Sequence, residues 1–403
     1  MSSTRVLVTG ASIAGPALAH WLRRRGAEVT VVERAPGLRP GGQAVDARGV
    51  AKEVIRRMGL DAAVRAACTE TTGARMVDAG GNVLQTFSAD DEGGDGYIAE
   101  IEILRGDLSQ VLHDDTRAGV EYVFGDRIAE LAQDADGVDV AFAGGGRRRF
   151  DLVVGADGLH STLRTMAFGP RERFVRHLGH VLAFYSVPNE FGLDRWMIEY
   201  QESESGRSAL LRPIQDATRG MAMFSFPAAD FDVDYHDVAA QKRLLRDRMA
   251  GLGWLAARIL AHLDDTPDFY LDQVAQVVMD RWSSGRVGLL GDAAFSSSPL
   301  SGGGTGLALV GAYLLAGELA AAGWNPEAGF AGYEGRMRSF VEANQEIGRL
   351  HARSLDVPGP DAEPSVAPEE WPMELIERAI NGVELPDYAG VPDSRASGSR
   401  RRG

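Results

Sequence analysis

Cysteine is almost missing from this chain, with Cys68 the only one among 403 residues. A single thiol excludes a disulfide within the chain and any metal site built on several cysteines. The scarcity fits a reducing compartment, so we expect a cytoplasmic protein. His177 and His180 have a spacing compatible with metal binding, but no third ligand is evident, and the sequence predicts no metal site.

Positive charge is also in short supply. The chain has 42 lysine and arginine residues against 57 acidic ones, which gives a net charge of −15. An acidic surface repels phosphate backbones, so we expect no nucleic-acid partner. The arginine runs at 147–149 and 400–402 are short and indicate solvated surface rather than a binding site.

Long uninterrupted apolar runs are missing as well. The longest apolar stretch, residues 307–324, contains Glu318 and several glycines, which predicts a buried helix rather than a membrane span. The N-terminus shows no signal-peptide pattern, because only a few apolar residues lie between Arg5 and Gly10. These absences predict no membrane partner and leave a monomer and a homodimer as open alternatives.

What is present begins with a strand, a helix and a second strand in residues 5–33. The first turn reads Gly-Ala-Ser-Ile-Ala-Gly from Gly10 to Gly15, and such glycines let the backbone approach a pyrophosphate at a helix N-terminus. Ser12 stands at the usual position of the middle glycine. Glu33 ends the second strand, where an acid accepts hydrogen bonds from ribose hydroxyls. The pattern predicts a dinucleotide site without separating NAD from FAD; the alternative is a plain helix start with a solvated Glu33.

Two more buried strands end in glycine-containing turns. Residues 151–164 read DLVVGADGLHSTLR, and Asp157 there is either a site residue or a helix cap. Residues 282–306 place Gly291 and Asp292 at a strand end, followed by Pro299 and Gly302 to Gly304 before a long helix. A carboxylate at a strand end can bind flavin ribityl hydroxyls, and exposed N–H groups before a helix would stabilise charge on a reduced flavin. The alternative is a flexible loop with Asp292 as a cap.

The remaining pattern predicts an α/β protein. We expect a hairpin over 74–87, strands over 120–123, 127–131, 138–141 and 148–154, an antiparallel sheet over 181–226, and mostly helix over 236–263. We expect a discontinuous Rossmann-like domain with a parallel sheet (1–72, 101–170 and 275–350). A substrate domain with an antiparallel sheet is inserted (73–100 and 171–274). A C-terminal helical segment and tail complete the chain (351–403).

In this order and spacing, the three motifs resemble the class A flavoprotein monooxygenases. This p-hydroxybenzoate hydroxylase-like family includes aromatic hydroxylases and tetracycline-modifying oxygenases. The resemblance spans about residues 5 to 350 and is most specific over 282–294. It implies non-covalent FAD binding by the three turns, the loop before the long helix and an arginine ahead of Leu108. The implied cofactor-binding residues are Gly10, Ser12, Ile13, Ala14, Gly15, Glu33, Arg34, Arg105, Asp157, Asp292, Pro299, Gly302, Gly303, Gly304 and Thr305.

The resemblance also implies the reaction. NAD(P)H reduces the flavin, O₂ adds to form a C4a-hydroperoxide, and an aromatic or polyketide-like small molecule is hydroxylated. The flavin performs this chemistry, so no side chain is assigned a catalytic role. No second glycine-rich strand–helix unit is evident, so NAD(P)H should bind transiently. Candidates to line the substrate pocket on the inserted sheet are Tyr185, Met197, Met221, Met223 and Phe224; the alternative for each is ordinary sheet core.

Three positions depart from the family pattern. Phe295 stands where histidine is frequent, Gly306 where asparagine is usual, and Gly311 where aspartate is usual. These departures keep open a catalytically impaired FAD-binding protein, beside an oxygen-independent flavin oxidoreductase and an NAD-dependent dehydrogenase. The segment around Asp292 argues against a simple dehydrogenase, because NAD has no ribityl chain to bind.

Overall fold

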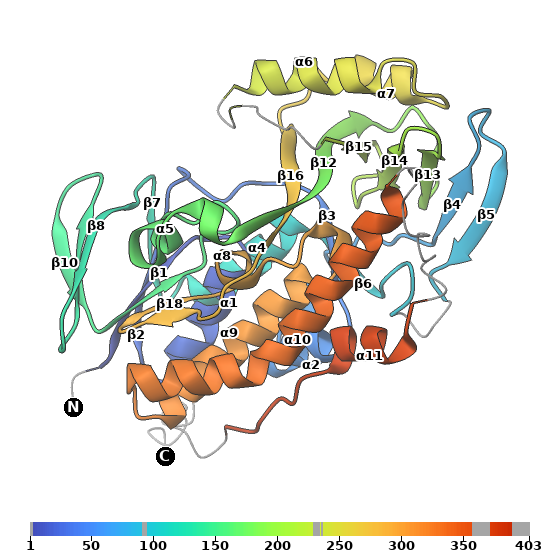
Figure 1. Ribbon diagram of the computed structural model, residues 1–403. Coiled ribbons are helices and arrows are strands. Elements are labelled where there is room, and N and C mark those ends of the chain that lie inside the picture. Colours follow the sequence, from blue (N-terminus) through green and yellow to red (C-terminus); the bar gives the residue numbers. More distant parts are fainter. Residues whose placement is uncertain (1–2, 91–94, 229–233, 235–236, 357–370, 389–403) are drawn as a thin grey trace.

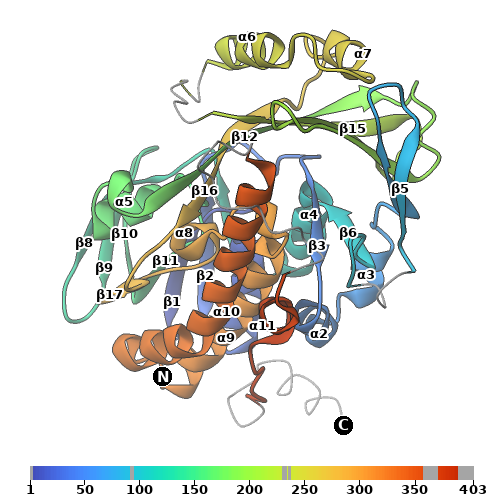
Figure 2. The ribbon, with the colours of Figure 1, turned by 45° about the vertical axis from the view of Figure 1, so that its right-hand side comes forward.

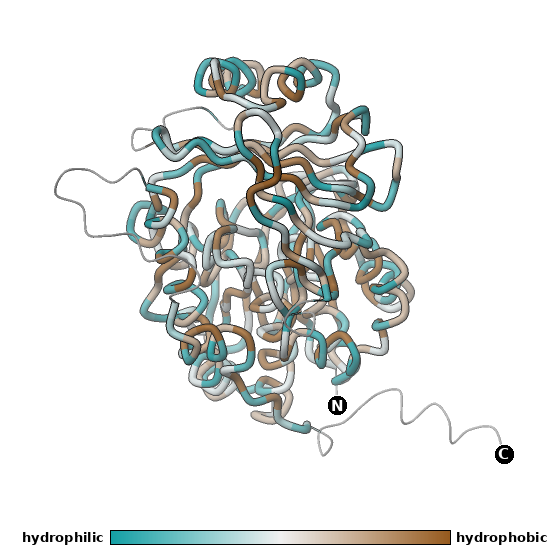
Figure 3. The backbone as a smooth tube through the Cα atoms, turned by 90° about the vertical axis from the view of Figure 1, so that its right-hand side faces the viewer, coloured by the Kyte–Doolittle hydropathy of each residue, from teal (hydrophilic) through white to brown (hydrophobic). Residues whose placement is uncertain are grey.

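The computed structural model describes residues 3–90, 95–228, 234, 237–356 and 371–388. Much of the predicted C-terminal tail lies outside these residues. A parallel sheet with covering helices forms the lower body in Figure 1, and a second, curved sheet crosses above it. The most apolar stretches run through the interior of the molecule (Figure 3).

The parallel sheet is assembled from four separate parts of the chain. Its order is β17 (Ser283–Ser284), β18 (Val287–Leu289), β11 (Leu152–Gly155), β1 (Arg5–Thr9), β2 (Glu28–Glu33) and β7 (Glu121–Phe124). All neighbours are parallel except β17 and β18. Because β1, β11 and β18 are adjacent and parallel, the three glycine-containing turns that follow them meet at one edge of the sheet.

The curved sheet has seven strands. Its order is β16 (Tyr270–Val277), β12 (Val175–Pro188), β15 (Arg219–Pro227), β14 (Arg207–Pro213), β13 (Trp196–Glu202), β4 (Gly73–Val77) and β5 (Val83–Ser88). All pairs are antiparallel except β13 with β4. Helices α6 (Val238–Met249) and α7 (Ala256–Ala261) lie over its outer face (Figure 2). The predicted hairpin and antiparallel sheet are confirmed.

One predicted strand, residues 148–154, is wrong as a single element. The chain changes sheets at Asp151. β10 (Arg147–Phe150) joins β9 (Val138–Phe142) and β8 (Ile128–Gln133) in a three-stranded antiparallel sheet, whereas β11 joins the parallel sheet. Two hydrogen bonds to Arg5 hold the chain at this break. The Asp151 N–H donates to the Arg5 carbonyl, and the Asp151 carboxylate accepts the Arg5 N–H. Each arginine of β10 pairs with an acid, among them Glu130, Glu121 and Asp134.

A two-stranded ribbon lies between the lower body and the inner face of the curved sheet. It consists of β3 (Ala44–Ala47) and β6 (Ile101–Leu104). The other helices are α1 (Ala14–Arg24), α2 (Val50–Met58), α3 (Asp61–Arg65), α4 (Arg105–Thr116), α5 (Thr162–Phe168), α8 (Asp292–Phe295), α9 (Gly304–Ala321), α10 (Pro326–Leu355) and α11 (Met373–Asn381).

Helix α9 is the predicted apolar helix. By length and composition its 18 residues could cross a membrane, but 78% of that stretch is buried inside the fold. It packs against α1, α2 and α10, as the core helix of a globular protein does. The α/β fold class is confirmed, and the exact domain boundaries stay a prediction.

Candidate functional site

The turn after β1 leaves no room for side chains at its two glycines. Gly10 has a φ of +96°, and a Cβ there would lie 2.4 Å from the Ala156 carbonyl oxygen. A Cβ on Gly15 would lie 1.9 Å from the Gly10 carbonyl oxygen. The helix that follows has Ile13 as its N-cap and no side-chain cap, so its first N–H groups are available to an anion.

The other two turns touch this one. The Gly10 position abuts Ala156 and Asp157 of the second motif, and a Cβ on Gly291 would lie 3.1 Å from the Ala14 Cβ. The tertiary fold therefore gathers three motifs, separated by more than a hundred residues each, around the N-terminus of α1.

Glu33 serves the first turn directly. Its two carboxylate oxygens accept the N–H of Ala11 at 2.9 Å and the N–H of Ala35 at 2.8 Å. The carboxylate is partly exposed, so it retains lone pairs for a ribose. Arg34, the next predicted residue, carries an exposed side chain.

Arg105 begins α4 and reaches back to the first turn. Its Nη1 donates to the Ser12 Oγ at 2.9 Å. Burial lowers the pKa of Arg105, and the nearby Arg39 lowers it further. Two cations held this close favour an anionic ligand such as a pyrophosphate. Arg39 escaped the sequence-based prediction, and only its nearness to Arg105 in space identifies it.

Asp157 acts as a cap. Its Oδ1 accepts the Ser161 hydroxyl, and its Oδ2 accepts the N–H of Thr162 at 2.8 Å and that of Leu163 at 3.2 Å. These bonds satisfy the N-terminus of α5. The geometry favours the capping alternative for this carboxylate, while its backbone still lies against Gly10.

Asp292 follows the third turn and is exposed to solvent. Desolvation by the surrounding protein nevertheless raises its pKa, which a bond from Ser296 opposes. The buried Arg164 lies near enough to Asp292 for the two charges to attract, and its Nη1 donates to the Ala293 carbonyl at 2.9 Å.

Residues 296–303, which we name the serine–glycine loop, lead from α8 to α9. Pro299 begins a 3-10 turn over Pro299–Ser301, and Gly302 has a φ of +65°. Gly303 caps α9 without a side-chain bond, and Gly304 and the buried Thr305 form its first turn. The positive end of a long helix is thus left open at the site.

The three departures from the family pattern differ in their surroundings. Phe295 is buried against Trp282, with ring centroids 4.7 Å apart. A Cβ on Gly311 would lie 3.5 Å from the Phe295 ring and 2.8 Å from the Leu290 Cδ1. A Cβ on Gly311 would thus be crowded by Leu290 and in ordinary contact with Phe295. Among the described residues, a Cβ on Gly306 would meet Ala51 alone, at 3.6 Å.

The curved sheet divides the predicted pocket residues between its two faces. Tyr185 and Phe224 lie on the outer face with the α6–α7 residues, and the Tyr185 hydroxyl donates to the Ile259 carbonyl at 3.1 Å. Met197, Met221 and Met223 lie on the inner face. The inclusion of Tyr185 and Phe224 is therefore corrected: side chains of a strand alternate between faces, and these two have the other parity.

The inner face adds residues that the sequence alone did not indicate. Leu182 and Phe184 pack with Met221 and with Leu104 of the ribbon, and Leu300 of the serine–glycine loop joins the same cluster. Phe184 pairs across the sheet with Met223. Phe184 has the opposite parity to the predicted Tyr185, and only the register of β12 with β15 shows that it shares the inner face with Met223.

A charged cluster borders this apolar surface. Asp46 and Glu102 are cross-strand partners in the ribbon. Arg48 pairs with Asp46 at 2.9 Å, and Arg212 of the inner face pairs with Glu102 at 2.9 Å. Burial raises the pKa of Asp46. Like charges directly opposite repel each other, so each acid depends on its own arginine.

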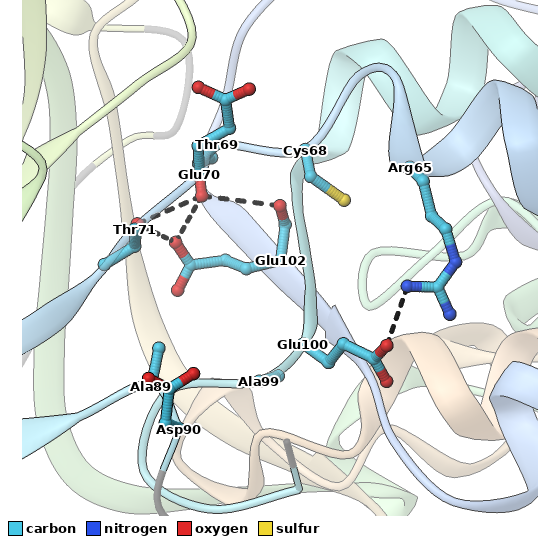
Figure 4. A pocket seen from close by; sticks show the side chains of 10 residues that line it. All are labelled: Arg65, Cys68, Thr69, Glu70, Thr71, Ala89, Asp90, Ala99, Glu100 and Glu102. Atoms are coloured by element: carbon cyan, nitrogen blue, oxygen red, sulfur yellow. Dashed lines mark hydrogen bonds and ion pairs between the residues drawn. The ribbon is translucent and has the colours of Figure 1, made fainter. Parts of the chain in front are cut away.

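Figure 4 shows a separate pocket of about 540 Å³ on the other side of Glu102. Thr69 and Thr71 both donate to Glu102 there, at 2.6 Å. Of the described residues, four carboxylates and no aromatic side chain line this pocket, so this lining suits neither a flavin ring nor an apolar substrate. None of the predicted cofactor residues belongs to it.

The residues around α1 fit FAD. The cradle at Gly10 and Gly15 excludes side chains, the α1 N-terminus and Arg105 favour a pyrophosphate, and Glu33 and Asp292 offer carboxylates on either side. Among the described residues no group of histidine, cysteine or acidic side chains could hold a metal ion.

Comparison with known proteins points the same way. Residues 3–346 match the family described as FAD binding domain. An uncharacterized protein of Mycobacterium tuberculosis (strain H37Rv) is 45% identical over 95% of this chain and 99% of its own. A flavin-dependent monooxygenase of Legionella longbeachae is 37% identical over 95% of this chain and 98% of its own. The crystal structure of tetracycline destructase Tet(51) has a TM-score of 0.83 and 36% identity, covering 96% of this chain and 100% of that one. The chain therefore belongs to the FAD-binding-domain family and is a class A flavin-dependent monooxygenase.

Proposed function

We propose that the enzyme hydroxylates a polycyclic aromatic or polyketide-like molecule that lies on the inner face of the curved sheet. The observation that carries this proposal is the sorting of side chains by face. An apolar strip of Leu182, Phe184, Met221 and Met223 looks toward the serine–glycine loop, and it ends at the charged cluster of Asp46, Arg48, Glu102 and Arg212. A flat apolar ligand with one polar edge matches such a surface.

The similarity to Tet(51) supports a substrate of the same size class. That protein is a tetracycline destructase by name, and tetracyclines are polycyclic molecules with a polar edge. For this chain we propose the chemical class alone, with the charged cluster facing the polar edge of the substrate.

We propose that Gly10, Gly15 and Arg105 hold the pyrophosphate of FAD, with Glu33 at the ribose and Asp292 at the ribityl chain. When bound, FAD would supply the redox chemistry, which is to accept hydride from NAD(P)H and to activate O₂. The chain's own residues orient the substrate and exclude water, and the apolar strip serves that second task. NAD(P)H docks transiently. The predicted domain boundaries, a cytoplasmic location and a monomer or homodimer belong to this proposal.

The cofactor part is tested by FAD titration of the apoprotein. Asp292→Ala should bind FAD roughly 10- to 150-fold more weakly, because hydrogen bonds to a charged group are worth about 1.5–3 kcal/mol. The FAD affinity of Asp292→Asn should fall between those of the native protein and Asp292→Ala, since the amide still accepts one hydrogen bond. Native affinity in the Asp292→Ala protein, together with a lower melting temperature, would instead make Asp292 a cap.

The substrate part is tested by a matched pair of substitutions on adjacent strands. Phenolic and enolic polycycles are first screened for faster NAD(P)H oxidation. With the best compound, Phe184→Leu on the inner face should raise KM by roughly tenfold or more. Phe224→Leu on the outer face should lower the melting temperature and leave KM unchanged. Equal KM values in the two variants would place the substrate elsewhere.

A further inference from the structure

One face of α10 runs along the back of the serine–glycine loop. Asn344, Gly348 and His351 recur at helical spacing, so they share a stripe. The Asn344 Oδ1 lies where a Cβ on Gly303 would collide with it, at 1.7 Å. Gly348 leaves room for the Ser297 carbonyl, which would lie 2.4 Å from a Cβ there. The helix thus supports the loop at successive points.

His351 provides the support nearest the tip of the loop. Its Nδ1 lies 2.8 Å from the Leu300 carbonyl oxygen. A carbonyl only accepts, so Nδ1 carries the proton and donates it. Burial lowers the pKa of His351, which favours the neutral ring. The Leu300 side chain packs into the apolar cluster of the inner face, so this bond fixes Leu300 between α10 and the proposed substrate surface.

The loop needs an external support because its own conformation is strained. Ser298 has a φ of +77°, in the left-handed region that disfavours residues other than glycine. Its buried Oγ finds no hydrogen-bond partner in the part of the chain that the structure describes. Such strain persists only where the surroundings over-determine the backbone. At the end of the loop, α9 begins with no side-chain cap, so the position of its N–H groups depends on how the loop is held.

We propose that His351 is a positioning residue for the flavin reaction: by holding Leu300, it keeps the open N-terminus of α9 facing the redox-active edge of FAD. This inference rests on the proposed placement of FAD. The N–H groups and the helix dipole favour the reduced, more negative flavin over the oxidised one. Loss of the bond should therefore weaken the binding of reduced FAD more than that of oxidised FAD.

The test compares three substitutions in the FAD-bound protein. His351→Leu removes the donor, His351→Asn places an amide N–H near the Nδ1 position, and His351→Gln places one near the Nε2 position. His262→Leu, at the outer end of α7, is the control. The readouts are the dissociation constant of oxidised FAD and the midpoint potential of the bound flavin.

We expect His351→Leu and His351→Gln to lower the preference for reduced over oxidised FAD by roughly two- to tenfold, the range of one hydrogen bond. A tenfold change corresponds to a midpoint potential lower by about 30 mV for a two-electron couple. His351→Asn and the control should keep the native potential. If His351→Leu does not fold, the Asn and Gln variants still decide the question.

Two results would overturn the inference. One is a native potential in His351→Leu, and the other is the same potential in the Asn and Gln variants. A native protein that binds no FAD would reject the proposed function itself, whereas native potentials in all three variants of a flavin-loaded protein would reject only the role of His351.

Discussion

At the residue scale, the site depends on a few side chains whose partners lie far away in the sequence. Ser12 is the clearest example. The family usually has glycine there, yet this serine accepts a hydrogen bond from Arg105, 93 positions later. The substitution thus orients the cation expected to meet the pyrophosphate.

Ser12→Ala should consequently weaken FAD binding. It removes the acceptor for Arg105, and a typical hydrogen bond contributes about 0.5–1.5 kcal/mol, or roughly two- to tenfold in dissociation constant. FAD titration followed by flavin fluorescence measures this effect. Ser3→Ala, which removes a surface bond to the Gly26 carbonyl, is the control. Tighter binding in Ser12→Ala would show that the serine is only tolerated.

Asp292 makes a prediction about pH. Because desolvation raises its pKa in the folded apoprotein, the folded state holds this proton more tightly than the unfolded chain. The stabilisation is fully present below the unfolded pKa and is lost as pH rises through the folded pKa. The free energy of unfolding of the native apoprotein, relative to that of Asp292→Asn, should therefore rise as pH falls below neutral.

Denaturant titrations at several pH values measure this difference. Asp78 provides the opposite case, because hydrogen bonds from Asn82 lower its pKa. The native protein should lose stability relative to Asp78→Asn as pH falls. If the difference in unfolding free energy between the native protein and Asp292→Asn does not change with pH, the assigned desolvation of Asp292 is contradicted.

At the element scale, α8 and α9 explain the unusual residues of the third motif. Phe295 of α8 lies in van der Waals contact with position 311 of α9, where the Leu290 Cδ1 leaves little room for a Cβ. Position 306 lies one helical turn and a half earlier and meets only Ala51. Positions 295 and 311 are thus packing neighbours, whereas position 306 lies apart from them.

Gly311→Asp should destabilise the protein strongly. The new carboxylate would lie among Leu290, Met337 and Phe295 without a partner, and an unpaired buried charge costs about 3–5 kcal/mol. Gly306→Asn should fold with native stability or gain a few tenths of a kcal/mol, because asparagine has the higher helix propensity. Thermal unfolding compares the two variants.

The double variant Phe295→His with Gly311→Asp restores the family's pair. An imidazole beside the carboxylate should recover part of the loss, so the double variant should be more stable than the sum of the single changes predicts. Strict additivity in this cycle would mean that the two positions do not interact.

At the scale of the whole molecule, the ribbon and the serine–glycine loop face the inner side of the curved sheet, and α10 connects the lower body to that sheet (Figure 2). The proposed substrate surface therefore lies between layers rather than within one. This arrangement lets a bound substrate complete the exclusion of water.

A bound substrate should accordingly couple NAD(P)H oxidation more tightly to product formation. Without it, NAD(P)H consumption should be slow and should yield H₂O₂; with it, consumption should accelerate and H₂O₂ per NAD(P)H should fall. Oxygen-18 from O₂ should appear in the product. Tyr185→Phe, which removes an outer-face bond to Ile259, should leave this ratio unchanged while lowering stability by about 1 kcal/mol. Label arriving from water would contradict the monooxygenase assignment.

The sequence by itself determined the fold class, the family and the three glycine turns. Local chemistry suffices there, because a Cβ on Gly15 would collide with the nearby Gly10 carbonyl, and the strands and helices around the turn follow from short-range periodicity. The roles of Asp157 and Ser12 needed the structure. A carboxylate can cap a helix or bind a ligand with the same local sequence, and the partner of Ser12 lies 93 positions away.

Only the tertiary structure decided which face of the curved sheet packs against the serine–glycine loop. Alternation along a strand separates two faces, but the covering of one face by α6 and α7 decides which remains, and this placed Tyr185 and Phe224 outside. The charged cluster and His351 are likewise long-range features. Asp46, Glu102 and Arg212 come from three distant segments, and His351 meets Leu300 across 51 positions. Such contacts depend on the packing of whole elements, which local sequence patterns do not specify.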